Sequence, residues 1–347
     1  MKKNVLIIRL SAMGDVALTV PVLKAAALTY PETNFTLLTR PKFTEVFAGI
    51  ENISFVTPDF AGKHKGFAGL IRLFILIRKQ VNPDRVIDVH DVLRTKILRI
   101  LFSLFGVKSV VFDKGRNEKK NLVKSKQIKP LQHATERYAL AFAKAGFAIN
   151  LSEITYPVVA LKNEAKVHEF TGEKNEIWIG IAPFASTKEK TYPLFLMQEV
   201  IKLLLQKPVT IIVFGGGKKE EAQTENLTAL SDRVISAVSK LKIPEEMALM
   251  SQCDAFIAMD SANMHLARLC GIPTVSVWGA THPATGFGAM GYEYEQNAIQ
   301  ANLQEVTCRP CSVFGNKACY KNSWECFAII QPSEIANQCL ALLKIEN

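Results

Sequence analysis

The stretch AFIAMDSANMHLARLCGIPTVSVWG, residues 255–279, places a helix-like segment between two apolar runs. Both runs are continuously hydrophobic rather than alternating, which is typical of strands buried on both faces of a parallel sheet. The segment between them opens with Ser261, a common helix-capping residue type, and carries His265. The stretch therefore predicts one strand–helix–strand unit of a doubly wound α/β domain.

The same alternation extends over the rest of the chain. Runs such as NVLIIRL and RVIDVH predict strands in the first half, and IWIGIAP and VTIIVFG predict strands in the second. The stretch from 151 to 176 is polar and weakly periodic, as linkers tend to be. We therefore expect two Rossmann-like domains facing a central cleft, over residues 1–155 and 177–347, with a linker at 156–176. The last helix is a candidate to pack back on the N-terminal domain.

Composition excludes several classes of protein. The chain has 347 residues, of which 48% are hydrophobic and 21% charged, so it is neither disordered nor membrane-spanning. The start, MKKNVLIIRL, is interrupted by Arg9 and has no cleavage pattern after it, so we interpret it as a first strand rather than a signal peptide. We accordingly expect a cytoplasmic protein whose seven cysteines are reduced thiols or metal ligands.

The net charge of +10 is concentrated in one segment. Nine Lys or Arg and three acids lie between Lys108 and Arg137. Such a patch suits nucleic acid, an anionic membrane or an anionic substrate, and a solvated loop explains it equally well. Because Phe112 is the segment's single aromatic residue, the stacking partners that nucleic acid requires are missing, and we expect no nucleic-acid partner.

Candidate catalytic chemistry begins after the first strand, in RLSAMGDVALTVP, residues 9–21. Asp15 lies where a helix is expected to start. As a structural residue it would only cap that helix. As a functional residue it is a carboxylate at the carboxyl end of a parallel strand, where α/β sheets bind ligands, and it could accept a proton from an attacking hydroxyl. The dinucleotide fingerprint G-x-G-x-x-G is absent from this turn.

Three segments that follow predicted strands of the second half combine glycines, hydroxyls and lysines. FASTKEKTYP carries Ser186 and Lys190, GGGKKEE carries Glu220, and DSANMH follows the strand AFIAM. Glycines, hydroxyls, lysines and a helix N-terminus together describe a diphosphate site, and a carboxylate nearby suits ribose hydroxyls. Each segment taken alone is more often a turn, but three at successive strand ends favour a nucleotide site.

The chain resembles glycosyltransferase family 9, the lipopolysaccharide heptosyltransferases. RLSAMGDVALTVPVLKA and MDSANMHLARLCGIPTVSVWGATHP are similar to the two signature regions of that family, and ASTKEKTYP is similar to its lysine-containing segment. The resemblance implies a GT-B fold, inverting heptose transfer from ADP-heptose, no cofactor, and an anionic acceptor, the inner core (Kdo or heptose) on lipid A. It assigns the catalytic base to Asp15, and the donor site to Ser186, Lys190, Glu220, Asp260, Ser261, Ala262 and His265. Ala262 replaces the family's usual glycine, and either Glu220 or Glu221 matches its ribose-binding acid.

The resemblance also gives the basic segment a role in acceptor binding. The cations that match are Arg94, Lys114, Arg116, Lys119, His133 and Arg137. The basic apolar stretch at 64–80 would either rest on the cytoplasmic face of the inner membrane, as a peripheral contact, or pack on the first sheet, and we favour packing.

Four cysteines near the C-terminus, Cys308, Cys311, Cys319 and Cys326, begin with C-x2-C spacing, which suits zinc, but the second pair lacks it. We expect structural thiols and no metal, with zinc as the alternative. Two other functions stay open: a transferase of the same fold with another donor or acceptor, and a non-catalytic nucleotide- or glycan-binding protein.

Overall fold

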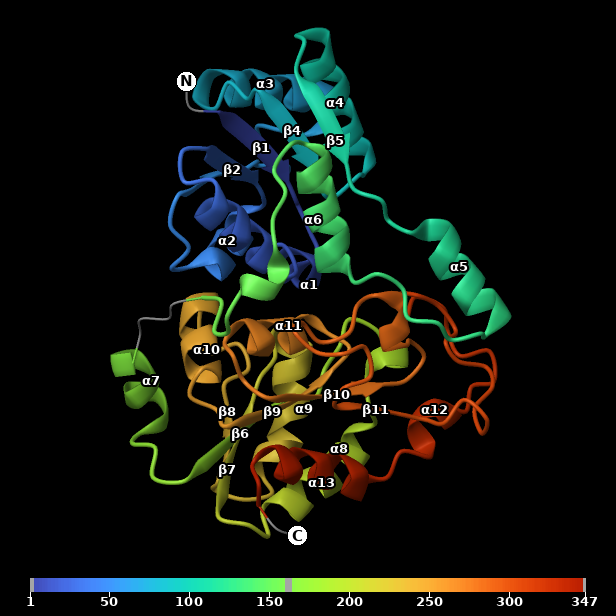
Figure 1. The fold of residues 1–347 in the computed structure, drawn as a ribbon. Coiled ribbons are helices and arrows are strands. Elements are labelled where there is room, and N and C mark those ends of the chain that lie inside the picture. The colour runs from blue at the N-terminus through green and yellow to red at the C-terminus, as the bar shows by residue number, and fades with distance from the viewer. Residues whose placement is uncertain (1–2, 160–163, 346–347) are drawn as a thin grey trace. The chain divides into compact units, whose positions relative to one another are not determined.

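The computed structural model describes residues 3–159 and 164–345 (Figure 1), so residues 160–163 of the expected linker lie outside the described chain. The described residues form two compact units. The first contains 3–114 and 134–159, and the second contains 115–133 and 164–345. The segment 115–133 therefore belongs with the second unit, although it lies within the sequence range expected for the N-terminal domain. Each unit is built on one parallel sheet, which confirms two α/β domains.

The first unit has a five-stranded parallel sheet in the order β3-β2-β1-β4-β5. Its central strand β1 is fully buried from Val5 to Ile8, because its side chains are all Val, Leu or Ile and helices cover both faces. This order is that of a Rossmann-like sheet, with β1 between the two directions in which the chain winds. The strands are β1 (Asn4–Ile8), β2 (Asn34–Leu38), β3 (Ile53–Val56), β4 (Arg85–Asp88) and β5 (Lys108–Val111).

The helix expected after β1 is divided in two. α1 (Met13–Ala17) ends where the Thr19 hydroxyl donates to the Val16 carbonyl at 2.6 Å, and α2 (Val20–Thr29) restarts with Pro21, which is suited to a first turn. The stretch at 64–80 forms a helix that packs on the sheet, as favoured from the sequence. The remaining helical segments of this unit are η1 (Pro41–Phe47), α3 (Gly66–Gln80), α4 (Leu93–Leu104), α6 (Ala134–Lys144) and η2 (Leu151–Glu153).

The second unit has a six-stranded parallel sheet in the order β11-β10-β9-β6-β7-β8. A core cluster on one face of this sheet, which includes Ile179, Ile257 and Val277, packs against the helices Leu194–Leu204 and Pro332–Leu342. The edge strand β11 was not predicted, because its three residues, Ala-Ile-Gln, carry no strand pattern. The strands are β6 (Ile177–Ala182), β7 (Val209–Val213), β8 (Val234–Ser236), β9 (Ala255–Met259), β10 (Thr274–Trp278) and β11 (Ala298–Gln300).

Helices of the second unit follow each strand in turn. The last helix packs against the helix Leu194–Leu204 and against β9 and β10, and its Cys339 is part of the core. Within the described residues, none of the helices combines the length and hydropathy needed to cross a bilayer. The helical segments are α5 (Arg116–Ser125), α7 (Glu164–Thr171), η3 (Lys188–Lys190), α8 (Leu194–Leu204), α9 (Lys218–Thr228), α10 (Ile243–Met250), α11 (Ala262–Leu269), η4 (Pro283–Thr285), α12 (Glu325–Ala328) and α13 (Pro332–Leu342).

Candidate functional site

Asp15 lies in α1, just beyond the carboxyl end of β1. It is the third residue of the helix rather than its cap, and its carboxylate accepts a long hydrogen bond from the Ala12 N–H at 3.4 Å. Arg9 Nη2 lies 2.5 Å from Asp15 Oδ2, and the Arg9 guanidinium is buried while 31% of the Asp15 side chain is exposed. Arg9 therefore holds the Asp15 carboxylate in place and leaves part of it accessible to a ligand.

The surroundings of this pair are buried and were not predicted from the sequence. Arg9 also donates to the carbonyl of Val89, after β4, and lies over the ring of the buried Tyr138 at 5.6 Å. His90 Nδ1 faces the Leu10 N–H at 3.4 Å. Burial, and secondarily the positive charge of Arg9, lowers the pKa of His90 to about 4, so its imidazole is neutral at neutral pH.

In the second unit, a buried ion pair joins two of the predicted donor segments. Lys190 Nζ lies 3.0 Å from Asp260 Oδ2, and the side chains are 14% and 10% exposed. The Thr281 hydroxyl donates to the same carboxylate oxygen at 2.7 Å. The ends of β6, β9 and β10 thus meet in one charged cluster, as expected of strand ends along one edge of a parallel sheet.

A buried arginine behind this cluster had no recognised sequence signal. Arg309 donates to the carbonyls of Gly279 and Thr281, both at 2.9 Å, and of Ala301 at 2.6 Å. It is fully buried, and burial lowers its pKa to about 10, so it stays charged at neutral pH. Because it holds the backbone of Thr281, Arg309 fixes the residue that donates to Asp260.

The first turns of α11 contain buried polar atoms that no described residue satisfies. Ser261 Oγ, at the helix cap, and His265 Nδ1 have no hydrogen-bond partner among the described residues. Burial lowers the pKa of His265 to about 3, with nearby positive groups adding to the effect, so its ring is neutral. Since buried polar atoms are nearly always paired, these atoms indicate a bound ligand beside the Lys190–Asp260 pair.

Glu220 lies in the first turn of α9, where Oε2 accepts from the Gly216 N–H at 2.8 Å. A Cβ at Gly215 would come within 2.7 Å of that same oxygen, so a side chain there would displace the Glu220 carboxylate. Burial raises the pKa of Glu220. The charge of Glu220 also acts on Glu246 of α10. Burial, and secondarily this charge, raises the pKa of Glu246 to about 7.

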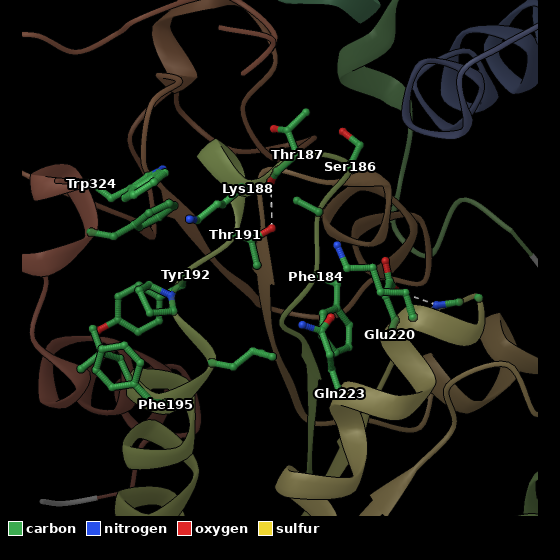
Figure 2. A pocket seen from close by; sticks show the side chains of 18 of the residues that line it. Phe184, Ser186, Thr187, Lys188, Thr191, Tyr192, Phe195, Glu220, Gln223 and Trp324 are labelled. Carbon is green, nitrogen blue, oxygen red and sulfur yellow. Dashed lines mark hydrogen bonds between the residues drawn. The ribbon is translucent and has the colours of Figure 1, made fainter. Parts of the chain in front are cut away.

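Glu220 and Ser186 line a pocket of about 940 Å³, within the size range of small-molecule sites (Figure 2). Its other walls are largely apolar and aromatic, and include Phe184 and Trp324. Lys188 Nζ lies over the Trp324 ring at 3.6 Å. The two lysines of this loop thus have different partners, since Lys188 contacts Trp324 and Lys190 contacts Asp260.

The six predicted acceptor cations are divided between the two units. Arg94 is exposed on α4, and in the same unit Lys114 Nζ donates to the Asp91 carbonyl at 2.7 Å and Arg137 lies 3.8 Å from Asp113. In the second unit, two of the cations contact the loop that follows η4: Lys119 lies over the Phe287 ring at 4.1 Å, and His133 is 3.1 Å from the Gly288 carbonyl. Arg116 is exposed at the start of α5.

The four C-terminal cysteines are free thiols. Among the described residues, no group of three or more His, Cys, Asp or Glu side chains is arranged to hold a metal ion. Cys326 belongs to the core of the second unit, and the Cys311 thiol is 3.6 Å from the Cys308 carbonyl.

Comparison with known proteins gives consistent matches. The model of glycosyltransferase family 9 (heptosyltransferase) matches residues 76–318. The Haemophilus influenzae lipopolysaccharide core heptosyltransferase OpsX is 24% identical over 319 residues, which cover 89% of this chain and 88% of the relative. The glycosyl transferase family 9 structure from Veillonella parvula has a TM-score of 0.77 at 20% identity, covering 99% of this chain and 97% of that one. The Escherichia coli heptosyltransferase WaaC with ADP has a TM-score of 0.61 at 20% identity, with coverages of 85% and 92%. These structures confirm the GT-B fold.

Proposed function

Because this chain belongs to glycosyltransferase family 9, we propose that it is an inverting heptosyltransferase that moves heptose from ADP-heptose to the inner core of lipopolysaccharide, Kdo or heptose, on lipid A. The observation that carries the proposal is the buried Lys190–Asp260 pair beside the unsatisfied Ser261 and His265. The names of the similar proteins, a lipopolysaccharide core heptosyltransferase and a heptosyltransferase with ADP, agree with this donor and acceptor.

The second unit, with residues 177–347 as its main part, is the donor domain of this proposal. Lys190 neutralises the diphosphate, and the N–H groups of Ser261 and Ala262 at the start of α11 donate to it. The Ser261 hydroxyl and His265 gain the partners that they lack without ligand. Asp260 holds Lys190 in place, and Ser186 and Glu220 contact the nucleoside from the pocket that they line.

The first domain presents the acceptor to Asp15. The acceptor hydroxyl gives its proton to the Asp15 carboxylate while its oxygen bonds to the anomeric carbon of the heptose. The bond from that carbon to the phosphate oxygen breaks on the opposite face, which inverts the configuration. ADP leaves with the additional negative charge, which Lys190 and the α11 N-terminus stabilise. Arg9 orients Asp15 as a positioning residue.

The acceptor in this proposal is anionic, in keeping with the net charge of +10. Arg94 and Arg116 are both exposed, and arginine matches carboxylates and phosphates in a bidentate manner. Of the other four predicted cations, Lys114 and His133 are partly exposed, whereas Lys119 and Arg137 are buried and less accessible to an acceptor. The enzyme would work at the cytoplasmic face of the inner membrane, where a lipid-linked acceptor is presented.

The test measures ADP release from ADP-heptose with a Kdo-bearing lipid A acceptor, for the wild type and for Asp15→Asn. We expect the variant to lose at least a thousandfold in kcat while ADP affinity stays within threefold, because the substitution removes the base and leaves the donor domain intact. A melting-temperature panel with ADP, UDP, GDP and CDP accompanies it, and a selective rise with ADP is expected. Normal turnover by Asp15→Asn, or a selective rise with another nucleotide, would refute the corresponding assignment.

A further inference from the structure

The outer surface formed by α3 and α4 is unusual among the described surfaces of the molecule. These two helices pack against each other on the first sheet (Figure 1). Half of the large hydrophobic side chains that the described residues expose lie on them or directly after α4, and each is 58–74% exposed: Phe67, Ile75, Leu93, Ile100, Leu104 and Phe105. Exposed apolar side chains gathered in this way indicate a binding surface rather than the scattered apolar residues of an ordinary surface.

The apolar residues of α4 form a continuous stripe. Leu93, Ile97, Ile100 and Leu104 are spaced at i, i+4, i+7 and i+11, which places them along one side of a helix. The opposite side of α4 is the one that packs in the core, through Leu98 and Phe102. Helix α4 therefore has two apolar sides. On the outer one Leu93, Ile100 and Leu104 are exposed, while Ile97 packs partly against the core.

The charge of the two helices is of one sign. Neither α3 nor α4 contains an acidic residue, and together they carry six basic ones. Arg99 is turned inward to Asp88 and Asp91, both at 3.0 Å. The other five basic residues are Arg72, Arg78 and Lys79 of α3 and Arg94 and Lys96 of α4. Two of them lie over aromatic rings at 4.8 Å: Arg78 over Phe105 and Arg94 over Phe60.

We propose that this α3–α4 surface docks the protein on an anionic phospholipid bilayer, a step that rests on the proposed function, since the acceptor is lipid-linked. Apolar side chains enter the headgroup boundary, and the long Lys and Arg side chains reach phosphate groups at the same depth. The uniform positive charge selects this occupant. A second copy meeting the same face would bring like charges together, whereas lipid phosphates neutralise them.

The position of the surface in the first unit fits this role. The loop from β4 into α4 contacts the loop that carries Asp15, because Val89 accepts from Arg9 and His90 faces the Leu10 N–H. The stripe begins at Leu93, three residues beyond His90. A bilayer in contact with α4 thus lies next to the edge of the sheet that carries the proposed catalytic base.

The test is co-sedimentation with vesicles of phosphatidylglycerol and phosphatidylcholine, and of phosphatidylcholine alone. The variant is Lys96→Glu with Ile100→Glu, one turn apart and exposed on α4. Its matched control is Lys144→Glu with Leu140→Glu, which has the same spacing and is also exposed, on α6 of the same unit. We expect the wild type and the control to bind anionic vesicles equally and the α4 variant to bind at least tenfold less.

Activity separates this proposal from the proposed function. With a de-acylated soluble acceptor the α4 variant should turn over like the wild type, and with the acceptor in vesicles its KM should rise at least fivefold. Equal vesicle binding by the α4 variant and its control, or no binding by the wild type, would overturn the docking surface. Vesicle binding without heptose transfer would leave the surface standing and overturn the function instead.

Discussion

Replacing Lys190 by Gln provides a direct measure of the donor site. Lys190 Nζ lies 3.0 Å from Asp260 Oδ2 in a pair that is about nine-tenths buried. At that distance and an effective dielectric constant of about 20, the attraction between the two charges is roughly 5 kcal/mol before desolvation. Glutamine keeps a donor but loses the charge, and a charge-assisted hydrogen bond contributes about 1.5–3 kcal/mol net.

Two consequences of this substitution can be measured separately. By calorimetric titration, we expect the Kd for ADP to rise about 10- to 100-fold, because the proposed diphosphate site loses the charge of Lys190. By urea unfolding without ligand, we expect a loss of about 2 kcal/mol, below the 3–5 kcal/mol typical when a buried pair is broken, since Thr281 still donates to Asp260.

The matched control is Lys188→Gln, which removes the same charge from the same short helix. Lys188 lies on the wall of the pocket with its Nζ over the Trp324 ring, whereas Asp260 pairs with Lys190, so we expect ADP affinity within about threefold of the wild type. Lys190→Arg should recover part of the affinity because it restores the charge. Equal losses in Lys188→Gln and Lys190→Gln would show that only net charge matters and would refute the specific role of the Lys190–Asp260 pair.

Three further predictions concern groups buried in the second unit. The pKa of Glu246 is raised to about 7, so the folded state holds this proton more tightly than the unfolded state, and stability falls as pH rises from about 4.5 to 7. Glu246→Gln should therefore melt at a higher temperature than the wild type at pH 8 and at the same temperature at pH 4.5. A difference in melting temperature that does not depend on pH would contradict this. The pKa of His265 is lowered to about 3, so the unfolded state takes up a proton first and stability is lost as pH falls below about 6.5. In melting scans from pH 7 to 5, His265→Gln should therefore show a smaller decrease in melting temperature than the wild type. An unchanged decrease would exclude His265 as the cause of the pH dependence. Arg309→Met leaves three backbone carbonyls without their donor and should cost about 4 kcal/mol in urea unfolding, whereas a cost below about 1 kcal/mol would show that water replaces the guanidinium.

Most strands of the two sheets follow from sequence patterns, whereas the order of the strands in each sheet comes from the structure. Runs such as NVLII and VTIIV are apolar throughout, and this occurs where helices cover both faces of a parallel sheet. The exception is β11, whose three residues become a strand only because β10 offers an unpaired edge. At the break between Ala17 and Val20 the Thr19 hydroxyl donates to the Val16 carbonyl, and Pro21 has no N–H with which to continue the first helix.

The candidate site divides in the same way. Lys190 and Asp260 could be singled out because each follows a predicted strand, and the structure joins them in one ion pair. Arg309 could not, because its partners are backbone carbonyls that leave no trace in side-chain identity. It also lies between Cys308 and Cys311, and their C-x2-C spacing suggests a metal site rather than a buried arginine. Similarly, the position of Asp15 inside α1 and its contact with Arg9 are visible only in the structure.

The buried Arg309 has a consequence for how the second sheet opens. One guanidinium joins the loop after β10 to the residue that follows β11, through Gly279, Thr281 and Ala301. A three-residue edge strand would ordinarily fray and exchange its amide protons rapidly. Opening of β11 would also break the hydrogen bonds that Arg309 donates to the backbone carbonyls. Amides at the ends of β10 and β11 should therefore exchange with deuterium at a common, slow rate. The edge of the sheet and the loop that carries Thr281, which donates to Asp260, should thus open together as one cooperative unit.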